Sequence, residues 1–118
     1  MHRDPRVLLA DVEQASTDIA LFTEGLTREA YLRDMLIQAA VERKFEIIGE
    51  ALKRLHRDHS EIARRIPRLR QVVDFRNLLI HGYDQVIPER VWSYTRHDLP
   101  ELRLVVQALL SELNLSDV

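Results

Sequence analysis

The chain has 118 residues, a formal net charge of -2 and no cysteine. This length predicts one domain with one core, residues 1–118, and a content of 46% hydrophobic and 31% charged residues indicates a globular protein rather than a disordered one. The lack of cysteine excludes disulfides and thiolate metal sites, which fits a reducing cytoplasm. The N-terminus lacks the apolar core of a signal peptide, and no apolar run approaches the roughly 20 residues of a membrane span. We therefore expect a cytoplasmic protein with no membrane partner.

The net charge conceals a basic segment. Between Leu52 and Arg76 there are eight cations and three anions, a local charge of +5, so the rest of the chain carries -7. Most of the cations are arginines, whose planar guanidinium matches phosphate oxygens. Such a strip favours a phosphate-rich ligand such as RNA or a nucleotide, although a charge run can also be only a solvated helical surface.

The apolar spacing in the first half of the chain predicts two helices. Asp4 and Pro5 suit the N-cap and the first position of a helix that Gly25 ends in a left-handed conformation. Thr27 is expected to cap a second helix of roughly 30 residues with two apolar faces, one of which can meet another copy of the chain. Gly49 inside this helix indicates the close approach of a neighbouring helix. The apolar stripe of the second helix includes Leu32, Met35, Leu36, Val41, Phe45, Ile48, Leu52 and Leu55.

The second half of the chain is predicted to be helical as well. Residues 56–66 form a basic connection with one short helical turn, and a third amphipathic helix runs from Pro67 to Gly82. After a loop, Pro88 begins a short helix, and Asp98 with Pro100 caps the last helix. We find no strand candidate and no internal repeat. The expected fold is all-α, an up-and-down bundle of four main helices with one extra short helix.

The segment Arg76-Asn77-Leu78-Leu79-Ile80-His81-Gly82-Tyr83 concentrates polar chemistry beside apolar residues. Polar groups next to a core are costly unless they are paired or used. Arg76 is a fixed cation suited to phosphate, and His81 can give or take a proton near neutral pH. Because these two residues differ by about 140° around a regular helix, either the helix relaxes at His81 or two motifs meet across a symmetric dimer.

The chemistry that suits this segment is metal-independent RNA cleavage without a cofactor. His81 would take the proton of the ribose 2′-hydroxyl or give one to the leaving oxygen, and Arg76 would stabilise the charge of the transition state. Asn77 would hold a neighbouring oxygen or orient His81, and Tyr83 would contact the substrate or stack on a base. No local cluster of carboxylates and histidines has the spacing of metal ligands.

The same residues also have purely structural interpretations. His81 can interact with the last carbonyls of its helix, and Arg76 can pair with Asp74 or Asp84. Asp74, two residues before the arginine, can either orient it or partly neutralise the site. A stripe of carboxylates in the second helix is either ion-paired surface or a contribution to the site. Its members are Glu42, Glu46 and Glu50.

Three segments of the chain resemble the HEPN superfamily in the form found in HepT toxins. They are FEIIGEAL in the second helix, FRNLLIHGY at the motif and VWSYTRHDLPEL before the last helix. Arg76, His81 and Tyr83 stand at the three marked positions of the HEPN motif, which reads Arg, four residues, His, one residue, Tyr. The resemblance covers nearly the whole chain.

This resemblance implies an all-helical homodimer with the motif in a cleft at the dimer interface. It implies that Arg76 and His81 are catalytic in a metal-independent ribonuclease, the toxin half of a toxin–antitoxin pair. It also implies an MntA-type nucleotidyltransferase partner that neutralises the toxin by transferring AMP to Tyr83. The alternatives are a non-catalytic HEPN module that binds a nucleotide or the nucleotidyltransferase, and a plain helical interaction domain.

Overall fold

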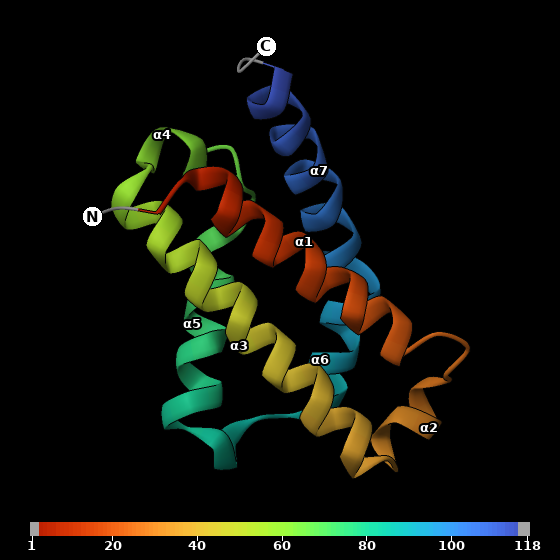
Figure 1. Cartoon of the computed structure of the whole chain (residues 1–118). Helices are drawn as coiled ribbons and strands as arrows, with labels where there is room; N and C mark the ends of the chain where they lie inside the picture. Colours follow the sequence, from red (N-terminus) through yellow and green to blue (C-terminus); the bar gives the residue numbers. More distant parts are fainter. Residues whose placement is uncertain (1–2, 116–118) are drawn as a thin grey trace.

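The computed structural model describes residues 3–115, and within that range it contains helices and turns but no strand, which confirms the all-α prediction. Consecutive long helices run in opposite directions (Figure 1). The α-helices in chain order are α1 (Pro5–Phe22), α2 (Arg28–Leu32), α3 (Met35–Asp58), α4 (Ser60–Ala63), α5 (Leu69–His81), α6 (Pro88–Ser93) and α7 (Leu99–Leu115). A 3₁₀ turn, η1 (Tyr83–Gln85), follows α5, and a π-helical turn, η2 (Tyr94–Asp98), joins α6 to α7.

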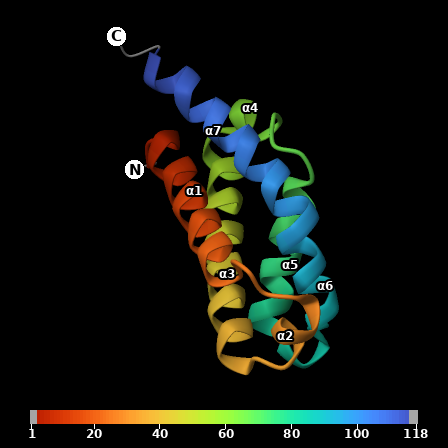
Figure 2. The ribbon, with the colours of Figure 1, turned by 90° about the vertical axis from the view of Figure 1, so that its right-hand side faces the viewer.

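Helix α3 is the centre of the structure because it packs against both α1 and α5, while α7 packs against α1 (Figures 1 and 2). The molecule is elongated, with extents of 47 × 30 × 20 Å. No helix among the described residues is both long enough and apolar enough to cross a membrane. The core is built mainly from fully buried side chains of these helices, which include Leu8, Leu9, Val12, Ile19, Val41, Ile48, Leu52, Leu55, Val106 and Leu109.

Helix α5, which carries the motif, is anchored more shallowly than the other long helices. All its residues are described, and Leu79 alone is buried. Leu69, Val72, Val73 and Phe75 pack against the core while staying partly exposed, and the Phe75 ring lies edge-on to Phe45 of α3 at 5.4 Å and to Tyr94 at 5.0 Å. Much of the α5 surface therefore stays exposed on the outside of the molecule.

Several predicted helix ends are confirmed. Asp4 precedes α1 and its carboxylate accepts a hydrogen bond from the backbone N–H of Arg6 at 2.8 Å. Thr27 precedes α2 and accepts from the N–H of Ala30 at 3.1 Å. Gly82 follows the last residue of α5. These contacts satisfy backbone groups that a helix end leaves without a partner.

The prediction of one helix of roughly 30 residues after Thr27 is wrong, because the chain breaks between α2 and α3. The carboxylate of Asp34 accepts a hydrogen bond from the N–H of Ile37 at 3.0 Å, which makes it the N-cap of a new helix. Met35 and Leu36, predicted to begin the apolar stripe, lie in the first turn of α3 and are 82% and 81% exposed.

Two further helix ends differ from the prediction. Gly25 has a positive φ of 75°, but α1 ends before Thr23, whose hydroxyl donates to the Ile19 carbonyl at 2.9 Å. Pro67 does not open α5, which begins only after Arg68 in a left-handed conformation with φ of 56°. The left-handed residue therefore lies beyond the end of α1 in the first case and directly before the start of α5 in the second.

The predicted separation of the short helix from the last helix is also wrong. The turn η2 connects α6 to α7 without interruption, and Asp98 is its last residue rather than a cap. A proline inside a helix clashes with the carbonyl four residues earlier and donates no hydrogen bond. The wider π turn directly before Pro100 accommodates that ring, so the helix continues past it.

Candidate functional site

Arg76 points from α5 toward α3, and its side chain is only 18% exposed. Its Nη2 forms an ion pair with Oε2 of Glu50 at 2.7 Å, and its Nη1 donates a hydrogen bond to Oδ1 of Asn77 at 3.0 Å. The acidic partner is therefore Glu50 of α3, not Asp74 or Asp84, both of which are exposed. The guanidinium is held on two sides, so its orientation is fixed within the chain.

Gly49 explains how Arg76 can lie so close to α3. A Cβ atom added at Gly49 would be 2.7 Å from Cγ of Arg76, closer still to its Cβ, and 3.4 Å from the carbonyl oxygen of Val72. No side chain fits in that space, which confirms that this glycine permits the close approach of a neighbouring helix. The stem of the motif arginine is packed directly on the α3 backbone.

A cleft of about 230 Å³ lies beside Arg76 where α1, α3 and α5 meet, and its lining includes four arginines, three carboxylates and several apolar side chains. Glu50 is the central anion, because its Oε1 accepts from Nε of Arg54 at 3.0 Å while its Oε2 faces Arg76. A carboxylate between two guanidinium groups occupies a position that a phosphate group would also fit. Within residues 3–115, no three His, Asp or Glu side chains are grouped to hold a metal ion.

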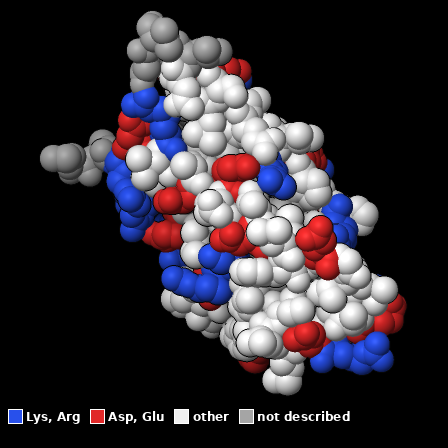
Figure 3. Space-filling view, turned by 45° about the vertical axis from the view of Figure 1, so that its right-hand side comes forward, with Lys and Arg blue, Asp and Glu red and all other residues white. Residues whose placement is uncertain are grey.

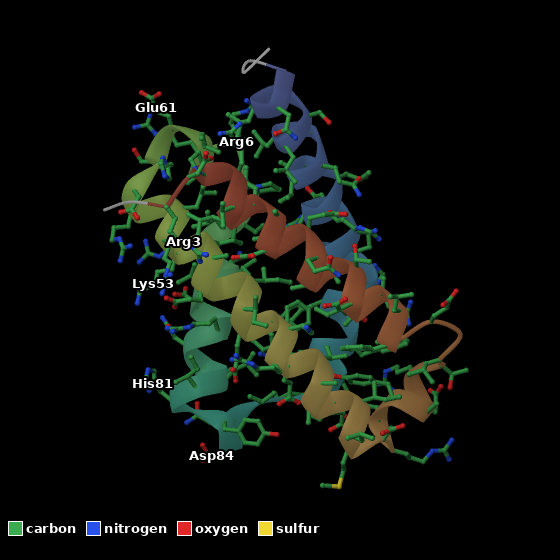
Figure 4. All side chains as sticks on the ribbon, viewed as in Figure 1. Arg3, Arg6, Lys53, Glu61, His81 and Asp84 are labelled. Atoms are coloured by element: carbon green, nitrogen blue, oxygen red, sulfur yellow. The ribbon has the colours of Figure 1, made fainter. Side chains whose placement is uncertain are left out.

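His81 lies apart from this cleft. It is the last residue of α5, it is exposed, and it is directed away from the body of the molecule (Figure 4). Within the described part of the chain its ring makes no hydrogen bond or ion pair with another side chain. Because α5 stays helical through His81, the first of the two alternatives, a relaxation of the helix at His81, does not occur. One chain therefore does not bring His81 and Arg76 together.

Tyr83 lies on η1 and is 61% exposed, and its hydroxyl interacts with the carboxylate of Glu42 on α3. Glu42 itself is only 6% exposed, and its Oε1 makes no hydrogen bond with any described group. Burial raises the pKa of Glu42, and the hydrogen bond from Tyr83 partly opposes that shift. The negative charge of Glu42 in turn raises the pKa of the Tyr83 phenol.

The carboxylates of α3 are thus the site residues that sequence reasoning left open. Glu50 contacts Arg76 and Glu42 contacts Tyr83, while Glu46 between them pairs with Arg43 at 3.1 Å. Their spacing of four residues is the sequence feature that indicates a shared position, because it places the three side chains on one face of a helix. The sequence did not show that this face lies against the motif.

The basic segment is less strongly cationic in the folded chain than its sequence suggests. On the face shown in Figure 3, basic and acidic side chains are interspersed. Lys53, Arg64 and Arg70 have no ion pair with any described residue and remain exposed or half-buried. Five arginines of the segment pair with acids: Arg54 and Arg76 with Glu50, Arg57 with Asp58, Arg65 with Glu112, and Arg68 with Asp98 and Glu101.

Comparison with known proteins gives a consistent result. Residues 12–109 match the model of a family described as ribonuclease HepT-like. A Thermococcus cleftensis protein named "Probable ribonuclease HepT" is 35% identical over 103 residues, which cover 87% of this chain and 93% of that protein. A Methanocaldococcus jannaschii protein named "Putative RNase MJ1216" is 30% identical over 115 residues, covering 98% and 94% of the two chains. No solved structure matches the chain.

Proposed function

Because this chain belongs to the HepT-like ribonuclease family, we propose that it cleaves RNA and acts as the toxin of a toxin–antitoxin pair. The observation that carries the proposal is the placement of Arg76, whose guanidinium matches phosphate oxygens, beside a cleft in a chain with this family membership. His81, at the surface, supplies the group that moves the proton. The site is completed by a homodimer.

The proposed reaction needs no metal. The 2′-oxygen of a ribose attacks the adjacent phosphorus, a new P–O bond forms, and the bond to the 5′-oxygen of the next nucleotide breaks. His81 takes the 2′-hydroxyl proton or gives one to the leaving oxygen. Arg76 stabilises the negative charge that grows on the phosphate oxygens, and Asn77 keeps the guanidinium in place.

A second copy of the chain is needed because Arg76 and His81 do not meet within one copy. The outward face of α5 is uncovered, and His81 projects from it (Figure 4). A two-fold axis beside α5 places His81 of one protomer against the Arg76 cleft of its partner. The proposed cleft is therefore shared between two subunits and open to a single RNA strand.

The proposed antitoxin is an MntA-type nucleotidyltransferase that transfers AMP to Tyr83. The exposed phenol is accessible to such a partner, and it lies two residues beyond His81. An adenylyl group there adds bulk and negative charge at the place where RNA must enter, which blocks binding by overlap and repulsion. The alternative is a non-catalytic module that uses the same surface to bind a nucleotide or the nucleotidyltransferase.

Expression without the antitoxin separates these two functions. We expect the wild type to stop growth and degrade cellular RNA, and the His81→Ala variant to do neither, because it has no group to move the proton. The matched control is His97→Ala, which removes an exposed histidine of η2 and should stay as toxic as the wild type. The purified protein should cleave RNA equally well in EDTA. Intact RNA with the wild type, or full toxicity of His81→Ala, contradicts the nuclease assignment.

Neutralisation is tested by incubating the purified chain with the nucleotidyltransferase and ATP. We expect the wild type to gain about 329 Da, the mass of one adenylyl group, or a multiple of it, and to lose its RNA cleavage. Tyr83→Phe should gain no mass because it lacks the hydroxyl that accepts AMP. Tyr94→Phe, which alters a half-buried ring that lies edge-on to Phe75, is the control and should be modified normally. Mass gain by Tyr83→Phe places the modification elsewhere.

A further inference from the structure

The carboxylate stripe of α3 includes one member whose environment is unusual. Glu42 is only 6% exposed, and no described cation forms an ion pair with it. Its Oε1 is buried without a hydrogen-bond partner. A buried carboxylate without a cation is costly, and such groups persist where they are neutralised or used in chemistry.

The group that faces Glu42 is the hydroxyl of Tyr83. The two come from different elements, α3 and η1, and η1 follows directly on α5, which packs on α3. Tyr83 is 61% exposed, so its phenol lies between a buried acceptor on one side and solvent on the other.

A protonated phenol is a weak nucleophile, and such groups are activated by an adjacent base. We propose that Glu42 is the general base that activates Tyr83 for nucleotidyl transfer, an inference that rests on the neutralisation proposed above. The phenol oxygen attacks the α-phosphorus of a nucleoside triphosphate held by the nucleotidyltransferase. The O–H proton passes to the Glu42 carboxylate, a Tyr83 O–P bond forms, and the bond to the β-phosphate oxygen breaks to release pyrophosphate.

The surroundings of Glu42 are consistent with this role. Burial raises the pKa of Glu42, which makes its carboxylate a stronger proton acceptor than an exposed one. The other titratable groups that face it are Glu46 on its own helix and Tyr31 on α2, together with Tyr83. The Tyr31 hydroxyl is buried without a partner, and burial raises its pKa, so it does not compete for the proton near neutral pH.

The test measures the rate at which the full-length chain gains the adenylyl mass with the nucleotidyltransferase and ATP. We expect Glu42→Gln to slow modification of Tyr83 about a hundredfold at neutral pH, the loss typical of a missing general base. The control is Glu13→Gln on α1, a half-buried carboxylate that also has an oxygen without a hydrogen-bond partner, and this variant should react within about twofold of the wild type.

The pH profile separates a base from a merely structural or electrostatic carboxylate. The rate at which the wild type is modified should fall at low pH as Glu42 becomes protonated. The Glu42→Gln variant should not show this fall. The Gln variant should instead accelerate steadily with rising pH, because removing the anion lowers the pKa of the Tyr83 phenol and more phenolate forms.

Two results overturn the inference in distinguishable ways. If Tyr83 of the wild type is modified and Glu42→Gln reacts equally fast across the pH range, Glu42 is not the base although the proposed neutralisation stands. If the wild type gains no mass while the nucleotidyltransferase is active on another acceptor, both the neutralisation and the part of Glu42 in it are wrong.

Discussion

The Arg76→Lys variant is expected to lose RNA cleavage about a hundredfold or more while keeping its fold. Lysine preserves the charge that faces Glu50, so this carboxylate keeps a cationic partner. It lacks the planar fork, so it cannot hold a phosphate through two parallel hydrogen bonds. Removing one such transition-state contact typically lowers the rate about 10²–10³-fold. The measurement is the single-turnover rate on a labelled RNA, with circular dichroism to verify the helical content.

Mixing variants tests whether the site is shared between subunits. Arg76→Lys and His81→Ala chains, each inactive alone, are unfolded together and refolded to form mixed dimers. A mixed dimer then holds one intact pairing of Arg76 from one protomer with His81 from the other. With random mixing, about half the dimers are mixed and one of their two sites is intact, so about a quarter of wild-type activity should return. Recovery of no activity contradicts a site formed across the interface.

The Gly49→Ala variant should be destabilised, although alanine is the better helix former. The added Cβ overlaps Cβ and Cγ of Arg76, and the first of these atoms cannot rotate away because it is fixed to the α5 backbone. Overpacking of this kind costs up to about 3 kcal/mol, against a gain of about 1 kcal/mol from helix propensity. We expect a net loss of about 2 kcal/mol, or about 8 °C in Tm.

Gly82→Ala is the matched control for this prediction. Its added Cβ would lie 3.0 Å from Cδ1 of Leu78, the movable end of a flexible side chain, and its φ of -131° is open to any residue. The stability of this variant should stay within about 0.5 kcal/mol of the wild type. Thermal melts of the two variants measure the difference, and equal melting temperatures would show that α5 can move away from α3 without penalty.

Local features of the fold were readable from the sequence because they act over few residues. Asp4 and Thr27 bond to backbone groups two or three positions away, so the caps need no knowledge of the rest of the chain. The break at Asp34 was missed because its neighbours continue an apolar pattern, and only the packed structure shows that Met35 and Leu36 face solvent. The π turn before Pro100 is a similar case, in which the backbone adapts to a residue that normally ends a helix.

The partner of Arg76 was partly accessible to sequence reasoning. The sequence offers Asp74 or Asp84 as that partner, but residues two apart, such as Asp74 and Arg76, differ by about 200° around a helix and do not face each other. That geometry alone argues for an acid on another helix. The identity of the acid depends on the register of α3 against α5, which is set by the space at Gly49 and is not visible in a linear sequence.

Glu50 has a consequence for how RNA would bind in the cleft. Arg54 and Arg76 already share this carboxylate, so they carry an internal counter-ion rather than a loose cloud of salt ions. A phosphate that enters displaces a tethered anion, and little dissolved salt is released in the exchange. These two arginines therefore orient the RNA while adding little to the dependence of binding on ionic strength. That dependence comes from cations such as Lys53 and Arg70, which have no acidic partner in the described chain.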